Sequence, residues 1–294
     1  MAADIETIKG VVSVPDAPER VLVLNPALAG SVYALDVPVL AVTASTRAAT
    51  EEGFSAPWAE QARAAKTEVM PWDFAQLNFE LILNYNPDLI IAGGQGRPSV
   101  LASEAYEQLS AIAPTVFVDT AITTWQGELE FLGEVFGRPE QVQDALDTYA
   151  ARVAEVKQAI SLPPQPTGFL LSLEAGRAPS FLPENSATPL LFAEVGFEPA
   201  AYLAEHPDFP LASTGDSASV EFEQVSTVFT SPSAVLIPWA PSSPMSEEFK
   251  SVAILQDIPA IVDGQTYDFP DYAYRFDYYG ALALLDRIEE VFAK

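Results

Sequence analysis

Arginines are scarce in this 294-residue chain, and four of them occupy positions suited to an anionic ligand. The sequence has 14 basic residues against 41 acidic ones. Arg47, Arg97 and Arg177 each follow, within five residues, an apolar segment typical of a buried strand, and Arg275 lies in an aromatic loop near the C-terminus. A guanidinium group binds carboxylates and other anionic oxygens through a planar fork of donors. Taken singly, each arginine is better explained by a surface ion pair, but the shared position of all four favours a ligand site.

Aromatic residues occur in the same predicted loops as these arginines, and three tyrosines (Tyr272, Tyr274 and Tyr278) surround Arg275. Arginine stacks on aromatic faces, so loops of this kind suit a bulky anionic ligand with flat rings or chelating arms. The residues predicted to bind the ligand are Arg47, Trp72, Gln95, Arg97, Arg177, Phe181, Trp239, Tyr272, Tyr274 and Arg275.

The segment PDLIIAGGQGRPS, residues 87–99, leads from an apolar run into a glycine-rich loop. Gly94 and Gly96 begin a dinucleotide-binding fingerprint, but Ser99 stands where its third glycine would be, so the match is weak. A plain turn, a ligand loop and a phosphate loop all remain compatible with these residues. The phosphate-loop alternative predicts a nucleotide-dependent α/β enzyme whose affinity for NAD or ATP is lost in Gly96→Val.

Composition excludes several other classes of function. The net charge of −27 repels nucleic acid and anionic lipid surfaces. The chain has no cysteine and a single histidine, His206, so thiol catalysis and a histidine-cluster metal site are excluded. Acidic pairs such as 51–52, 247–248 and 289–290 are adjacent in sequence and are typical of solvated helix faces. We therefore expect no catalytic residues, no cofactor and no metal ion bound directly by the protein.

Short β-like segments alternate with helical patterns in both halves of the chain, which predicts mostly parallel sheets covered by helices. In the first half we expect strands at 20–25, 39–43, 88–92 and 115–118, and helices at 26–36, 77–85 and 106–112. In the second half we expect strands at 167–173, 234–238 and 260–264, helices at 189–196 and 247–255, and a closing helix that includes 279–292.

One long amphipathic helix separates the two halves. Apolar residues recur at three- and four-residue steps from 142 to 160, and the prolines of SLPPQP then stop the helix. The fold class expected is therefore α/β, with two Rossmann-like lobes at 1–137 and 163–294. A domain-spanning helix within 138–162 joins them, and the ligand cleft is expected between the lobes, beyond the carboxyl ends of their strands.

A short pseudo-repeat supports this division. Phe79 and Glu80 open a predicted helix that is followed by a proline and the strand 88–92; Phe222 and Glu223 likewise precede a proline and the strand 234–238. From the residues alone, each glutamate is explained as a helix-start acid that the helix dipole favours.

Several of these segments resemble one family, the solute-binding proteins of ABC importers for ferric siderophores, haem and cobalamin. The resemblance covers most of the chain and rests on GVVSVPDAPERVLVLN, LNFELILNYNPDLII, LSAIAPTVFV, FGRPEQVQDAL, LLFAEVGF and IPAIVDGQTYDF. It implies that the protein captures a ferric-siderophore chelate outside the cytoplasm and delivers it to a membrane permease for iron uptake. It also implies that Glu80 and Glu223, one on each lobe, dock into arginine pockets of that permease.

The resemblance further implies a monomer in the periplasm or anchored to the membrane by lipid, with the signal segment absent from this chain. No arginine precedes Glu80 in VMPWDFAQLN and no tryptophan precedes Glu223 in FPLASTGDSASV, which disfavours hydroxamate siderophores. Haem or cobalamin is the alternative ligand within the same family. For haem, Tyr272 or Tyr274 would be the residue that ligates iron.

Overall fold

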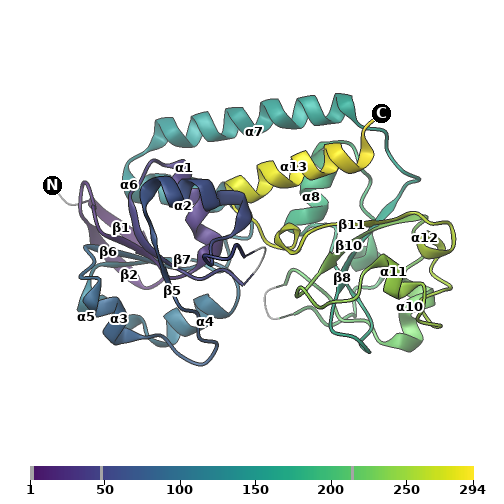
Figure 1. The fold of residues 1–294 in the computed structure, drawn as a ribbon, viewed down its shortest axis with the longest axis horizontal. Helices are drawn as coiled ribbons and strands as arrows, with labels where there is room; N and C mark the ends of the chain where they lie inside the picture. Colours follow the sequence, from purple (N-terminus) through teal and green to yellow (C-terminus); the bar gives the residue numbers. More distant parts are fainter. Residues whose placement is uncertain (1–2, 47–48, 213–214) are drawn as a thin grey trace. The chain divides into compact units, whose positions relative to one another are not determined.

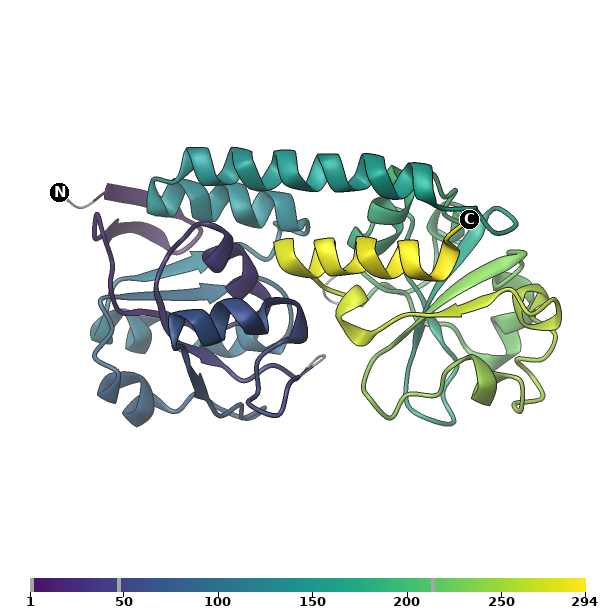
Figure 2. The same ribbon diagram turned by 45° about the horizontal axis from the view of Figure 1, so that its top comes forward.

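The computed structural model describes residues 3–46, 49–212 and 215–294, and the chain divides into two compact units. Unit 1 comprises Met1–Tyr149 and Phe276–Gly280, and unit 2 comprises Ala150–Arg275 and Ala281–Lys294. The helix α7, Pro139–Ala159, is uninterrupted and contributes residues to both units (Figure 2). The sequence assigned the segment 276–280 to the second lobe, whereas it packs with unit 1.

The described residues of unit 1 form one five-stranded parallel sheet and one antiparallel hairpin. The strand order in the sheet is β5-β4-β3-β6-β7, and each neighbouring pair is parallel. The strands are β1 (Ala3–Thr7), β2 (Gly10–Val14), β3 (Val21–Val23), β4 (Val39–Thr43), β5 (Glu68–Met70), β6 (Leu89–Gly93) and β7 (Thr115–Val118).

Helices cover both faces of this sheet, with α3, α4 and α5 on one face and α1, α2 and α6 on the other (Figure 1). Alternate strand residues divide between the two faces: Leu22 and Ile90 belong to the same buried cluster as Ile82 of α3 and Leu109 of α5. The helices are η1 (Pro26–Leu28), α1 (Ala29–Ala34), η2 (Ala56–Trp58), α2 (Ala59–Ala65), α3 (Phe79–Asn84), α4 (Arg97–Glu104), α5 (Tyr106–Ile112) and α6 (Trp125–Phe136).

The sheet of unit 2 has the order β11-β10-β8-β9, and only β9 is antiparallel to its neighbour. The strands are β8 (Thr167–Ser172), β9 (Ser180–Phe181), β10 (Ser233–Pro238) and β11 (Thr266–Asp268). The helices are α8 (Ala187–Glu194), α9 (Tyr202–Glu205), η3 (Phe222–Gln224), α10 (Val225–Val228), α11 (Ser246–Phe249), α12 (Pro259–Val262), η4 (Asp271–Ala273) and α13 (Tyr278–Phe292).

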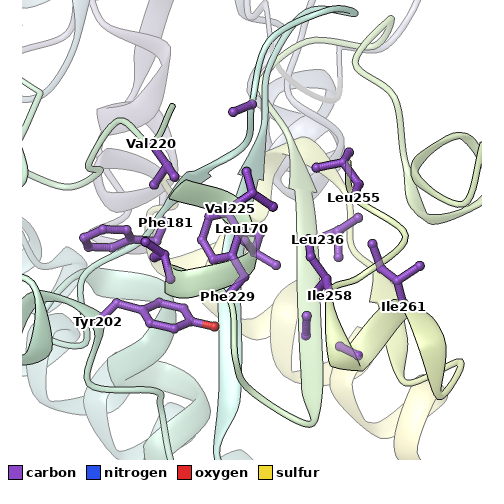
Figure 3. Packing of buried hydrophobic residues seen from close by; sticks show 14 of the residues in the cluster. Leu170, Phe181, Tyr202, Val220, Val225, Phe229, Leu236, Leu255, Ile258 and Ile261 are labelled. Carbon is purple, nitrogen blue, oxygen red and sulfur yellow. The ribbon is translucent and has the colours of Figure 1, made fainter. Parts of the chain in front are cut away.

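The core of unit 2 is rich in aromatic side chains. Figure 3 shows Phe181, Tyr202 and Phe229 packed with Leu170 of β8 and Leu236 of β10. On the opposite side of the sheet, the ring of Phe169 lies 5.0 Å from that of Phe192 on α8. Burial of side chains this large supplies most of the stability of such a unit.

The α/β architecture with mostly parallel sheets is confirmed, and most predicted elements form within a few residues of the expected bounds. The strand expected at 260–264 is wrong, because Pro259–Val262 forms the helical turn α12 and the strand is β11, directly after it. Ala260 and Ile261 are buried while Val262 is exposed, which is a helical rather than an alternating pattern. The helix expected at 247–255 is limited to α11. The hairpin β1–β2 was not predicted.

Two buried carboxyl groups lie where α13 begins in unit 1. The Asp277 carboxylate accepts hydrogen bonds from the backbone N–H of Gly30, at 2.9 Å, and of Gly280, at 3.0 Å, so it joins α1 to the first turn of α13. Burial raises the pKa of Asp277 to about 6. Burial, and secondarily the charge of Asp277, raise the pKa of Glu128 on α6 well above its ordinary value. The folded protein therefore holds protons at these groups that the unfolded chain releases.

Glu128→Gln is expected to raise the free energy of unfolding at pH 7 by roughly 2 kcal/mol. A carboxyl group whose pKa is higher in the folded state stabilises the protein at pH values below its unfolded pKa, and this contribution is lost as the pH rises through its folded pKa. For Asp277 the loss falls between pH 3.8 and about pH 6. The neutral amide removes this penalty at Glu128 and relieves Asp277. Urea unfolding followed by circular dichroism between pH 4.5 and 8 measures the effect. The exposed Glu107→Gln is the control, and a pH dependence parallel to that of the wild type would contradict the prediction.

Candidate ligand-binding site

In unit 1, Arg97 joins two loops that follow different strands of the sheet, β6 and β5. It is the first residue of α4, directly after the glycine loop that ends β6. Its Nε donates a hydrogen bond of 3.0 Å to the backbone oxygen of Phe74, in the loop after β5. The exposed guanidinium of Arg97 is therefore fixed at the carboxyl edge of this sheet, where α/β proteins bind ligands.

The glycine loop itself is held by buried polar contacts. The side-chain amide of Asn25 donates to the backbone oxygens of Gly93, at 2.7 Å, and Gln95, at 3.0 Å. The Gln95 amide donates to the backbone oxygen of Thr120, so much of its hydrogen-bonding capacity is used inside the protein. Asn25 is a positioning residue that the sequence analysis missed. The signal was its place before Pro26, where it caps η1 through a hydrogen bond from the Ala27 N–H.

Trp72 and Phe74 form an aromatic pair beside Arg97. Their rings meet edge to face, with centroids 5.3 Å apart. Phe74 is 66% exposed as a residue, which is unusual for a phenylalanine. The indole Nε1 of Trp72 is buried and has no hydrogen-bond partner among the described residues. An exposed ring beside a fixed guanidinium provides a surface for a flat, anionic ligand.

Unit 2 has a comparable group at the carboxyl end of β10. Trp239 follows this strand, and its backbone N–H donates a hydrogen bond of 2.8 Å to the backbone oxygen of Ser172 at the end of β8. Trp239 is 41% exposed as a residue, and its ring lies 5.7 Å from the ring of Tyr274. The Arg275 guanidinium stacks on the other ring of this pair, with its Cζ 4.7 Å from the Tyr274 centroid. Tryptophan, tyrosine and arginine thus meet at one strand end.

Arg275 also forms an ion pair that the sequence did not indicate. Its Nε lies 2.7 Å from the Oδ2 of Asp216, and the two side chains are only 17% and 18% exposed. Burial alone would lower the pKa of Arg275. The hydrogen bond to Asp216 and the interactions with Tyr274 together outweigh burial, so the pKa of Arg275 is raised. Asp216 and Arg275 are 59 residues apart, so no local pattern could pair them.

The tyrosines of the C-terminal loop are poorly suited to ligating iron. Burial raises the pKa of Tyr272 to about 12 and also raises the pKa of Tyr274. Both phenols are protonated at neutral pH, and a metal would have to displace that proton. The Tyr272 hydroxyl is directed at α13, where it lies 3.4 Å from the backbone oxygen of Ala283.

Three other predicted ligand-binding residues need separate description. Phe181 is fully buried and packs against Tyr202 (Figure 3), and its ring also lies 5.9 Å from that of Phe209. It therefore belongs to the core and offers no surface to a ligand, which corrects the sequence prediction. Arg177 is exposed after β8 and lies 4.0 Å from Glu174. Arg47 lies outside the described residues.

Glu80 and Glu223 are both exposed and occupy equivalent places in the two units. Glu80 is in the first turn of α3, which Asn78 caps by accepting a 3.0 Å hydrogen bond from the Leu81 N–H. Glu223 is in η3, where the Glu221 N–H donates 3.0 Å to the Gln224 side chain. Each short helix precedes an inner strand of its sheet, β6 or β10. Neither glutamate is needed to form its helix cap.

Among the described residues, no group of three or more histidine, aspartate or glutamate side chains is arranged to hold a metal ion. Within the same part of the chain, no helix is both long and apolar enough to cross a membrane.

Comparison with known proteins identifies the family. The model of the periplasmic binding protein family matches residues 21–273. The chain belongs to this family. Over 292 residues it is 28% identical to the ferric enterobactin-binding periplasmic protein FepB of Escherichia coli O6:H1, a match that covers 97% of this chain and 89% of FepB. The petrobactin-binding protein YclQ of Bacillus subtilis is 28% identical over 153 residues, or 51% of this chain and 44% of YclQ.

Solved structures share the fold of this chain. The structure of holo-ViuP superposes with a TM-score of 0.83 at 22% identity and covers 99% of this chain and 95% of ViuP. Staphylococcus aureus SirA, complexed with staphyloferrin B, superposes with a TM-score of 0.75 at 18% identity over 98% of this chain and 97% of SirA. These likenesses show the fold, and the matched family is one of binding proteins.

Proposed function

We propose that this periplasmic binding protein captures a ferric-siderophore complex and delivers it to the permease of an ABC importer for iron uptake. The observation that carries the proposal is an arginine next to exposed aromatic residues at the carboxyl edge of each sheet: Arg97 bonded to the backbone oxygen of Phe74, and Arg275 stacked on Tyr274 beside Trp239. The full-length similarity to a ferric enterobactin-binding protein supports the same ligand class.

In this proposal the iron arrives already chelated, so the protein needs complementary charge and shape rather than metal ligands of its own. Arginines offset the negative charge of the chelate, which the net charge of −27 would otherwise repel. Arg97 and Arg177 are the described candidates, Arg275 is a third whose charge Asp216 partly offsets, and Arg47 is a fourth. The aromatic rings of Trp72, Phe74 and Trp239 supply apolar contact area.

We further propose that the protein acts as a monomer outside the cytoplasm, either free in the periplasm or anchored by lipid. Its partner is the transmembrane permease, and Glu80 and Glu223 are the docking residues. Their exposure, and their equivalent places before β6 and β10, support this role.

Titration with a panel of ferric hydroxamate, catecholate and carboxylate complexes, followed by tryptophan fluorescence, tests the ligand class. We expect saturable quenching by at least one complex and weaker quenching in Trp239→Phe, because the Trp239 ring is exposed at the proposed site. Absence of quenching by every ferric siderophore would overturn the proposal. A shift of the visible absorption band of haem on mixing would instead favour the haem alternative.

A further inference from the structure

Asp216 is held firmly at the edge of the sheet of unit 2. Two residues further along the chain, Ala218 pairs with Phe181 of β9 through two backbone hydrogen bonds of 3.1 and 2.9 Å. The backbone oxygen of Ser217, the residue between them, accepts a hydrogen bond of 2.8 Å from the Ala212 N–H. The Asp216 carboxylate therefore has a defined position beside the C-terminal aromatic loop.

Both oxygens of this carboxylate are engaged. Oδ2 accepts from Arg275 Nε at 2.7 Å, and Oδ1 accepts from the Tyr274 hydroxyl at 2.8 Å. The Tyr274 ring in turn lies beneath the guanidinium of Arg275 and against Trp239. Charge-assisted contacts of this kind are the ones an arginine and a tyrosine would offer to the carboxylate of a ligand.

We propose that Asp216 is a specificity-determining residue that occupies the carboxylate-binding edge of Arg275 and so selects against chelates that bind iron through carboxylates. The proposal rests on the proposed function above. A ligand carboxylate would have to displace Asp216 from Arg275 and Tyr274 or approach its charge. A chelate whose donors belong to catechol rings is also anionic, but it needs no carboxylate contact with Arg275, because it can stack on the exposed face of Trp239.

Unit 2 would then have a defined preference for one class of chelate. The positive charge of Arg275 is offset locally by Asp216, while the aromatic surface beside it remains accessible. The chelate class favoured is therefore aromatic and catecholate, and the class disfavoured is the α-hydroxycarboxylate type represented by ferric citrate. Specificity of this kind depends on a repulsive element as well as on attractive contacts.

Asp216→Ala tests the preference, with a ferric tris(catecholate) and ferric citrate as the two probes. We expect the wild type to bind the catecholate complex tightly and ferric citrate weakly, and we expect the variant to gain about tenfold or more in affinity for ferric citrate. Asp286→Ala is the matched control, since it removes an equal charge from a more exposed ion pair of unit 2, with Arg152. An unchanged ratio of the two affinities in Asp216→Ala, or an equal change in Asp286→Ala, would overturn the proposal.

A second measurement does not depend on any siderophore. Formate should fit the space vacated in Asp216→Ala and restore the contacts to Arg275 and Tyr274, so it should raise the Tm of the variant more than chloride does at equal ionic strength. The wild type should show no such difference, and equal responses would contradict the inference. Should Asp216→Ala fail to fold, Asp216→Asn allows the same binding comparison with a side chain of nearly the same shape. An unchanged ratio of the two chelate affinities in Asp216→Asn would overturn the proposal. If no chelate binds the wild type, the proposed function is wrong, whereas the formate measurement still tests whether Asp216 occupies an anion-binding position at Arg275 and Tyr274.

Discussion

Glu80→Ala and Glu223→Ala are each expected to abolish uptake of the ferric chelate while leaving its affinity for the purified protein unchanged. Both carboxylates are exposed, and neither closes the cap of its helix. Loss of a helix-start acid costs about 0.3–1 kcal/mol of stability, so the variants should stay folded. Removal of a docking charge from either unit would instead leave an arginine of the permease without a partner at the interface, which is strongly unfavourable.

Uptake of the radiolabelled chelate is measured in a host strain that lacks its own copy of the gene and carries each variant. Glu107→Ala and Glu205→Ala are the matched controls, because both are exposed glutamates in the first turn of a helix of unit 1 and unit 2, respectively. Glu80 follows the loop that carries Trp72 and Phe74, so a contact with the ligand is the competing role for it. A loss of ligand affinity in Glu80→Ala or Glu223→Ala would assign that glutamate to the binding site and contradict docking.

Strand positions could be predicted from the sequence because the inner strands are buried on both faces. Leu89–Gly93 and residues 234–237 are continuously apolar and buried, and few other structures bury every side chain in a run of four or five. Helix starts were predictable for a local reason as well, since Asn78 and the residues after it carry their own capping signal. Once these strands and helix starts are predicted, the positions of Glu80, Glu223 and Arg97 at their ends are predicted as well.

The parts of the site that could not be predicted depend on contacts between distant segments. Phe181 belongs to a two-residue strand whose burial is decided by Tyr202 and Phe209, so its sequence neighbours gave no sign of it. The pairing of Arg275 with Asp216 is of the same kind. Sequence pattern indicates which aromatic and charged residues lie in loops near a strand end, but their partners are set by the tertiary fold.

Gly93→Ala is expected to lower the free energy of unfolding of unit 1 by roughly 4 kcal/mol, which combines the backbone and steric penalties of a side chain at this position. Gly93 ends β6 with a φ of +92°, a conformation that L-residues avoid. A Cβ there would lie 2.2 Å from the backbone oxygen of Val118 on β7. That oxygen belongs to the sheet and accepts a 2.9 Å hydrogen bond from the Gly94 N–H, so it cannot move without separating β6 from β7.

Gly137→Ala separates the two contributions. Gly137 also has a positive φ, of +62°, but a Cβ there meets nothing within 4 Å, so only the backbone penalty of about 1 kcal/mol applies. Urea unfolding of both variants gives the difference, and hydrogen exchange of the β6 amides shows whether the loss is local to the sheet. Because the same glycine lets the loop 94–96 turn toward Arg97, weaker chelate binding should accompany the lost stability in Gly93→Ala and not in Gly137→Ala. Equal destabilisation by the two substitutions would show that the approach of β7, and hence the steric argument for this loop, is wrong.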